Sequence, residues 1–149
     1  MKRIAYLILI ATLGLFSSCG SSDTEVASKY PNGKPMKEFK IAWEGDNKLV
    51  VGEIRYYPNG QKEIEGAYDK EGKKTGKWTS WYASGKISKE ENYLADKKHG
   101  RQIDYYESGK PNFESNYKNN IPDGDWIFYD GQGNKKSRIV FKDGRKVGQ

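Results

Sequence analysis

The chain has 149 residues, of which 31% are charged, and its mean hydropathy is −0.95. This length is enough for one domain, and the single cysteine and single histidine exclude an internal disulfide and a zinc site built from cysteine and histidine. The formal net charge is +6, but the last fifteen residues carry six basic side chains against one acidic side chain. A nucleic-acid-binding protein is expected to carry its basic residues along an extended face, so the sequence argues against nucleic acid as a partner.

Residues 1–18 have the organisation of a lipoprotein signal peptide. Lys2 and Arg3 precede an apolar run of thirteen residues, Ile4 to Phe16, which is shorter than the roughly 20 residues of a membrane-spanning helix and typical of a signal peptide. Small residues before Cys19 resemble a bacterial lipobox, which implies cleavage before Cys19 and attachment of diacylglycerol to its thiol. An ordinary secretory signal followed by a free cysteine is the alternative. We expect a lipid anchor at Cys19 that holds the chain in the bacterial cell envelope, at the outer membrane, with the leaflet left open.

A short polar segment follows the signal peptide. The residues after Cys19 are Gly-Ser-Ser-Asp-Thr-Glu, a composition typical of a flexible linker. We interpret residues 19–29 as a flexible tether between the anchor and the rest of the chain.

A short pattern is repeated along residues 30–149. Gly52 begins a series of glycines spaced 24 residues apart. Each unit predicts a strand rich in aromatic and β-branched residues, a tight turn such as Tyr-Pro-Asn-Gly or Tyr-Glu-Ser-Gly, and a return strand. The predicted first strands cover residues 54–57, 78–82, 102–106 and 126–129, and the return strands end at Ile41, Tyr68, Tyr93, Tyr117 and Phe141.

A fixed period of this length indicates a repeat architecture. A single hairpin is only marginally stable in water, whereas stacked hairpins bury each other's faces. We therefore predict an all-β fold, an elongated antiparallel array of β-hairpins in one twisted or rolled sheet. Its core is expected to be thin, with aromatic side chains supplying most of the apolar surface.

Alternation along the strands separates candidate core residues from candidate binding residues. Trp78 falls on one face of its strand and Trp81 on the other. Tyr105 and Phe128 are predicted to hold the places analogous to Trp81 in the next two units. These three residues form a candidate row for binding a partner if that face is exposed, and belong to the core if the sheet is rolled so that both faces are covered.

The sequence contains no recognisable constellation of catalytic residues. His99 lies in a polar loop, and a general base would need an acid or nucleophile within hydrogen-bond reach; we interpret it as a solvated turn residue. The acidic pairs at positions 69 and 71 and at positions 123 and 125 lack the ligand spacing of a calcium loop. We therefore predict that the protein is not an enzyme and uses no cofactor or metal.

The pattern Gly-x-Trp-x-x-x-Tyr-x-x-Gly-Lys, followed by an aromatic residue eight positions after the second glycine, is similar to the MORN repeat. It resembles more closely the variant found in YwqK-family antitoxins. The best copies begin at Gly76 and Gly100, and the copy at Gly124 has its tyrosine shifted by one position. The resemblance covers roughly Tyr30 to Gln149. MORN resemblance implies scaffolding, dimer formation or phospholipid contact, and the antitoxin name implies a toxin partner.

These features predict a non-catalytic, lipid-anchored envelope protein that serves as a binding or scaffold module for an unidentified envelope protein or glycan. The alternative is an antitoxin-like protein that neutralises a partner toxin. The basic C-terminal end has two interpretations: contact with anionic lipid or polymer, or the polar cap that repeat arrays need at their ends.

Overall fold

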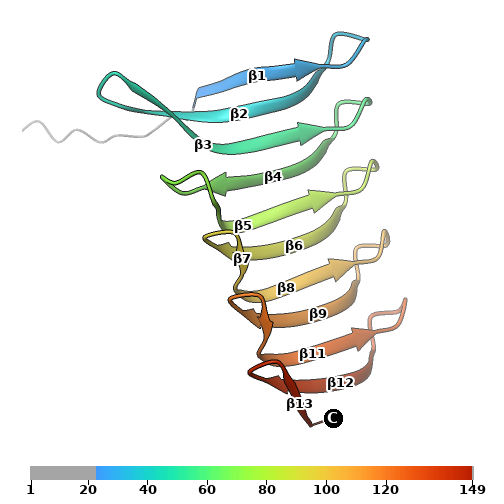
Figure 1. The fold of residues 1–149 in the computed structure, drawn as a ribbon. Coiled ribbons are helices and arrows are strands. Elements are labelled where there is room, and N and C mark those ends of the chain that lie inside the picture. The colour runs from blue at the N-terminus through green and yellow to red at the C-terminus, as the bar shows by residue number, and fades with distance from the viewer. Residues whose placement is uncertain (1–22, 149) are drawn as a thin grey trace, which may run out of the picture.

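The computed structural model describes residues 23–148, which form one open antiparallel sheet in a single layer (Figure 1). The longer strands lie in the sheet in the order in which they follow along the chain, and the two-residue strands β7 and β10 pair only with the strands before them, so each hairpin lies against the next. This arrangement confirms the predicted all-β hairpin array. The strands are β1 (Asp23–Lys29), β2 (Pro35–Glu44), β3 (Asn47–Tyr56), β4 (Lys62–Tyr68), β5 (Lys74–Trp81), β6 (Ile87–Leu94), β7 (Lys97–Lys98), β8 (Gly100–Tyr105), β9 (Pro111–Lys118), β10 (Ile121–Pro122), β11 (Gly124–Tyr129), β12 (Lys135–Lys142) and β13 (Arg145–Gly148).

The first strand lies in the segment that the sequence assigned to a flexible tether, and for residues 23–29 that prediction is wrong. β1 pairs with β2, from Asp23 opposite Ile41 to Lys29 opposite Pro35. Almost all of its side chains are exposed. Backbone pairing rather than apolar burial therefore holds this strand, and its polar composition carries no strand signal.

Five hairpin turns of the same geometry line up along one edge of the sheet (Figure 1). In the turn that starts at Tyr82, the Tyr82 N–H donates to the Lys86 carbonyl and the Gly85 N–H donates to the Tyr82 carbonyl, both at 2.8 Å. Gly85 has a φ of 84°, a conformation that glycine adopts without strain. We call this side of the sheet the tyrosine edge; its turns span residues 30–34, 57–61, 82–86, 106–110 and 130–134.

The opposite side, which we call the hairpin edge, is less regular. The later hairpins close there through two-residue turns with positive φ, such as Ala95 and Asp96. By contrast, β2 and β3 continue for ten residues each to a turn at Gly45. The β2–β3 hairpin therefore projects beyond its neighbours at this edge (Figure 1), and we call it the projecting hairpin.

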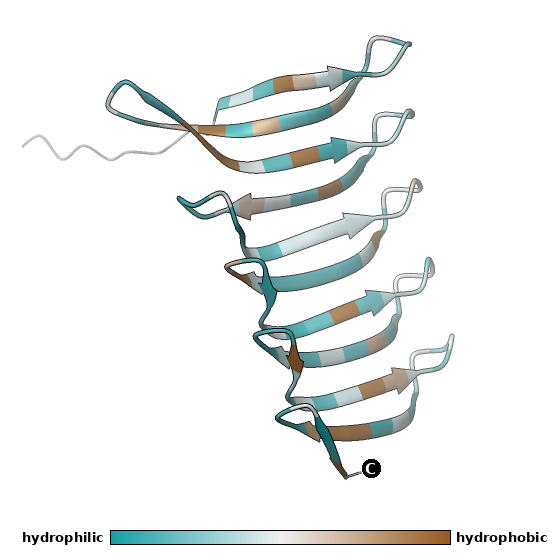
Figure 2. Cartoon of the chain, viewed as in Figure 1, coloured by the Kyte–Doolittle hydropathy of each residue, from teal (hydrophilic) through white to brown (hydrophobic). Residues whose placement is uncertain are grey.

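Trp78 is the centre of the thin core. Its side chain is 4% exposed, and its ring packs edge-on against Tyr68 and Tyr93 at centroid distances of 5.4 and 6.3 Å. Gly66 lies against the indole, and a Cβ added there would be 2.1 Å from it, so the packing requires glycine. Figure 2 shows the consequence of so thin a core: apolar residues occur as isolated bands on mostly hydrophilic strands.

The place of Trp78 is held by a second tryptophan in one unit and by a glutamine in another. The indole N–H of Trp78 donates to the Ala67 carbonyl at 3.1 Å, and that of Trp126 donates to the Asn116 carbonyl at 3.4 Å. The Gln102 amide makes the same link, to the Asn92 carbonyl at 3.1 Å. A side-chain N–H directed at the previous strand is thus repeated even where the aromatic ring is not.

Candidate functional site

The predicted lipidation residue, Cys19, lies outside the described residues. The predicted binding row can be compared with the structure directly, and its three members do not lie together. Trp81 and Tyr105 share a face, but Phe128 lies on the face of Trp126, where its ring is 4.7 Å from that of Phe113. All three predicted side chains are half-buried rather than exposed.

The place analogous to Tyr105 is held by Tyr129, not by Phe128. Tyr105 donates a hydrogen bond to Glu90 at 2.9 Å, and Tyr129 donates one to Glu114 at 2.8 Å. Asp130 starts the last turn, where every earlier turn of the tyrosine edge starts with tyrosine. Tyr129 is therefore not a turn tyrosine shifted by one position. Because the prediction treated it as one, it assigned the place analogous to Tyr105 to Phe128 instead of Tyr129.

The tyrosines that start the turns explain the substitution at Asp130. Each of their hydroxyls donates to a backbone carbonyl at the end of the first strand of the next unit; Tyr82, for example, donates to the Tyr105 carbonyl at 2.6 Å. The other donors are Tyr30 to Tyr56, Tyr57 to Trp81 and Tyr106 to Tyr129. Within the described residues no further turn of this kind follows residues 130–134, so a tyrosine at Asp130 would lack this acceptor.

On the face of Tyr105, a carboxylate forms the same kind of ion pair in successive units. Lys77 contacts Glu90 at 2.6 Å, and Arg101 contacts Glu114 at 2.8 Å. The hydrogen bond from Lys77 holds the pKa of Glu90 below its usual range, while burial and the bond to Glu90 raise the pKa of Tyr105 to about 12. In the last unit the charges are exchanged, and Asp125 on the first strand contacts Arg138 on the second at 2.7 Å. Exchange with retention of the pair indicates a structural role for these charges.

Among residues 23–148, Glu53 is the most deeply buried charged side chain, at 1% exposure. It occupies the place that Trp78 holds in the next unit, and it forms ion pairs with Lys37 at 2.6 Å and with Arg55 at 2.8 Å. Burial by itself would raise the pKa of Glu53, but the contact with Lys37 and the charge of Arg55 outweigh it, so the pKa lies below its usual range. Both partners are within the same sheet, so Glu53 is compensated and is not a free catalytic acid.

At the hairpin edge, three successive boundaries between hairpins are closed by backbone hydrogen bonds. The Asp96 N–H donates to the Lys74 carbonyl at 3.0 Å, and the Asn120 N–H donates to the Lys98 carbonyl at 2.9 Å. In return, the Lys74 and Lys98 N–H groups donate to the side-chain oxygens of Asp96 and Asn120. At the third boundary Gly144 donates to the Pro122 carbonyl; Pro122 has no N–H and Gly144 no side-chain acceptor.

The first boundary of this edge lacks the corresponding bond. Val50 pairs with Ile41 as Lys74 pairs with Tyr68, so its carbonyl holds the place of the Lys74 acceptor. The turn that should reach it, residues 69–73, folds on itself: the Gly72 N–H donates to the Asp69 carbonyl at 3.0 Å. We call this boundary the open seam and define it by β3 residues 47–51 on one side and turn residues 69–73 on the other.

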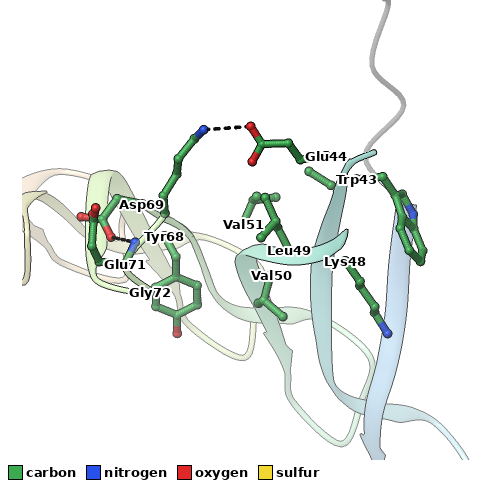
Figure 3. A pocket seen from close by; sticks show the side chains of 12 residues that line it. Trp43, Glu44, Lys48, Leu49, Val50, Val51, Tyr68, Asp69, Glu71 and Gly72 are labelled. Atoms are coloured by element: carbon green, nitrogen blue, oxygen red, sulfur yellow. Dashed lines mark hydrogen bonds and ion pairs between the residues drawn. The ribbon is translucent and has the colours of Figure 1, made fainter. Parts of the chain in front are cut away.

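A hollow of about 780 Å³ occupies the open seam. Its walls are mainly apolar, and Trp43 and Val50 on the projecting hairpin are 59% and 41% exposed. Lys70 of the turn reaches across to Glu44 of the hairpin at 3.2 Å, and a dashed line at Glu44 marks this ion pair in Figure 3. The residues that line it are Ala42, Trp43, Glu44, Lys48, Leu49, Val50, Val51, Tyr68, Asp69, Lys70, Glu71 and Gly72.

Sequence reasoning missed this site, although one signal was present. The chain runs nine positions from Ile41 to its partner Val50, six from Tyr68 to Lys74, and five from Tyr93 to Lys98. Comparing these intervals would have distinguished the first boundary from the later ones.

The described residues show no arrangement typical of a catalytic or metal centre. In residues 23–148 no group of three or more His, Cys, Asp or Glu side chains is placed to hold a metal ion. The His99 ring lies 3.3 Å from the Asn119 side chain, in an exposed contact between two turns. The same part of the chain contains no helix that is long and apolar enough to cross a membrane.

Comparison with known protein families agrees with the hairpin units. Residues 53–70, 74–95 and 98–119 match the MORN repeat variant. The three matched segments are consecutive and run from β3 to the turn after β9. No curated protein matches the chain. The MORN match supports a repeat-based binding or scaffold module, a role that is generally non-catalytic.

Proposed function

We propose that the chain is a lipid-anchored module of the bacterial cell envelope that binds a protein or glycan partner through its MORN-like array. The observation that carries this proposal is the apolar hollow at the open seam, next to the exposed Trp43 and Val50. A concave, mostly apolar site of several hundred Å³ is typical of binding sites, and clustered exposed apolar residues mark interaction surfaces. Elsewhere on the described sheet, the candidate row at Trp81 and Tyr105 is half-buried.

The proposed anchor is a lipid on Cys19. Cys19 precedes Asp23, the first residue of β1, by four positions, and an extended chain covers at most ~14 Å over that length. Asp23 pairs with Ile41 near the base of the projecting hairpin. An anchor at Cys19 would thus hold the hairpin with Trp43 near the membrane and leave the later units extending away from it.

Labelling the full chain in bacterial cells with a palmitate analogue tests the anchor. We expect the label to be lost in Cys19→Ala. A Cys19→Ala protein that still carries the label would contradict a lipid anchor at this position.

Recovery of partners from envelope extract tests the binding role. The full chain, purified in detergent, is expected to retain a reproducible partner that Trp43→Ala releases and that Val147→Ala keeps, because Val147 is equally exposed (62%) but lies at the other end of the array. Release of the partner by Trp81→Ala and not by Trp43→Ala would show that the partner binds at the row predicted from the sequence.

The antitoxin alternative rests on the likeness to YwqK-family repeats. It predicts a protein that stays in the cytoplasm and neutralises a toxin, so fractionation of the labelled cells separates it from the envelope proposal. A chain found in the cytoplasmic fraction without lipid would favour it.

A further inference from the structure

The open seam exposes a strand edge that the other boundaries cover. On its first side β3 pairs with β2 from Asn47 to Arg55, but on its second side β4 pairs only with residues 52–56. Among residues 23–148 no strand pairs with the second side of residues 47–51. Backbone N–H and C=O groups on an unpaired strand edge are a template for another strand.

The missing interaction has a defined chemical form. At each closed boundary an N–H from the neighbouring turn reaches the carbonyl of the residue that corresponds to Val50. At the open seam that donor is bonded within its own turn, at Asp69. A backbone N–H supplied from outside would therefore complete at Val50 the contact that Asp96 makes with Lys74.

The charged residues around the hollow indicate which charge a bound partner should carry. The two basic residues that line the hollow are already paired, since Lys48 contacts Glu25 and Lys70 contacts Glu44. Lys73, at the end of the turn, does not line the hollow. Asp69 and Glu71, which also line the hollow, form no ion pair with another residue of the described part of the chain. The rim thus presents unpaired acidic groups around apolar walls, which favours basic side chains on the partner.

We propose that the open seam receives an extended segment of a partner protein, which adds as a strand to residues 48–51. The segment places apolar side chains against Val50 and Tyr68 and basic side chains beside Glu71. Strand addition of this kind takes affinity from main-chain hydrogen bonds and specificity from alternate side chains. The inference rests on the proposed binding function and narrows it to a protein partner of apolar and basic composition.

Peptide binding to the full chain in detergent tests this inference. The probe is a fluorescein-labelled eight-residue peptide of alternating valine and lysine, followed by fluorescence anisotropy. We expect saturable binding and slower hydrogen exchange at the amides of residues 48–51. We also expect Kd at least about ten-fold weaker for the peptide of alternating valine and glutamate, and no binding when alternate amides of the probe are N-methylated, because such a peptide cannot pair with a strand edge.

Val50→Lys is the decisive variant. Lys74 and Lys98 stand at the corresponding places in later units, so the repeat accepts lysine there and the fold is expected to be kept. The substitution puts a positive charge at the seam and should weaken the probe's Kd at least about ten-fold. Val147→Lys is the matched control, because it makes the same change at an exposed valine on β13 and should leave Kd unchanged.

Other outcomes would overturn the inference. Equal binding of the N-methylated probe, or unchanged binding in Val50→Lys, excludes strand addition at β3. A dimer of the full chain that dissociates in Val50→Lys would assign the seam to a second copy, and binding to detergent or phosphatidylglycerol vesicles with no peptide binding would assign it to lipid. An envelope partner that is retained by Val50→Lys would leave the proposed function standing while refuting this mode of binding.

Discussion

At the tyrosine edge, every boundary between successive turns of the described chain is bridged by a tyrosine hydroxyl, whereas at the hairpin edge one of the four boundaries is open. Both edges are made by the same hairpins, so the difference does not come from the fold as a whole. It comes from two local changes, the longer β2–β3 hairpin and the longer turn at residues 69–73. The constant edge holds the units together, and the variable edge provides a surface that is not needed for stacking.

The largest expected loss of stability comes from a substitution in the closed part of the array, and the same kind of substitution in the projecting hairpin should cost little. Trp78→Ala removes a buried indole that packs on Tyr68 and Tyr93, and we expect the free energy of unfolding to fall by about 3–5 kcal/mol. Trp43→Ala, at a side chain that is 59% exposed, should change it by less than about 0.5 kcal/mol. Urea unfolding followed by circular dichroism compares them; equal losses would mean that the projecting hairpin is as much a part of the core as Trp78.

The second prediction concerns the buried carboxylate of the first unit. Glu53→Gln removes the charge that Lys37 and Arg55 compensate, and because both partners are partly exposed (29% and 48%) we expect a loss of about 1–3 kcal/mol at pH 7. Since folding lowers the pKa of Glu53, its ionised form stabilises the folded state above the unfolded pKa of about 4.5. That contribution disappears as the pH falls through the lower, folded-state pKa.

The measurement is urea unfolding between pH 6 and pH 3. The wild-type chain should lose more stability than Glu53→Gln as the pH falls below about 4.5, so the two curves converge. Glu71→Gln, a change at an exposed side chain, should follow the wild-type curve. Parallel curves for wild type and Glu53→Gln would show that Glu53 contributes nothing that depends on its charge.

Much of this architecture could be predicted from the sequence, because glycine and tyrosine punctuate it. The turns at Tyr57, Tyr82 and Tyr106 were predicted from turn chemistry, and their two backbone hydrogen bonds are as expected. The glycine series was misleading at its first member. Gly76 and Gly100 have positive φ within the first three residues of their strands, but Gly52 does not, and it pairs with Ala67 inside the sheet.

What the sequence could not provide was the equivalence of chemically unlike residues. Gln102 and Glu53 hold the position in their units that Trp78 holds in its own, because a side-chain N–H or an ion pair can replace an indole there. Tyr129 and Phe128 are adjacent aromatic residues, and only the register with β9 tells which face each occupies. The missing hydrogen bond at the candidate site leaves no motif either, and only the longer interval from Ile41 to Val50 marks it.

A smaller loss of stability is expected when one hydrogen bond of the tyrosine edge is removed. Tyr82→Phe deletes the hydroxyl that donates to the Tyr105 carbonyl at 2.6 Å, and a bond of this kind is worth about 1 kcal/mol net. Tyr117→Phe is the control, because its hydroxyl makes no hydrogen bond to another residue of the described range. A loss in Tyr82→Phe no larger than in Tyr117→Phe would argue that the ladder of hydroxyls is not what holds successive units together.

The smallest effect should come from closing the open seam. Replacing residues 69–73 with Lys-Asn-Asn-Lys gives this turn the length of the later ones and the Asn119–Asn120 geometry, with positive φ at both central residues. The second asparagine could then donate its N–H to the Val50 carbonyl and accept from the Val50 N–H, as Asn120 does with Lys98. Two such bonds favour closure, while the exposed Lys70–Glu44 pair, worth about 0–1 kcal/mol, is lost.

We therefore expect a gain of about 0.5–1 kcal/mol in the free energy of unfolding and slower hydrogen exchange at Val50, measured by NMR. The same variant should no longer bind a peptide at the seam, because its own turn now occupies the strand edge. A stabilised protein that still binds would mean that the edge of β3 is not the docking element. A destabilised one would mean that the long turn is itself required by the projecting hairpin, so the first boundary would be a structural exception rather than an unfilled site.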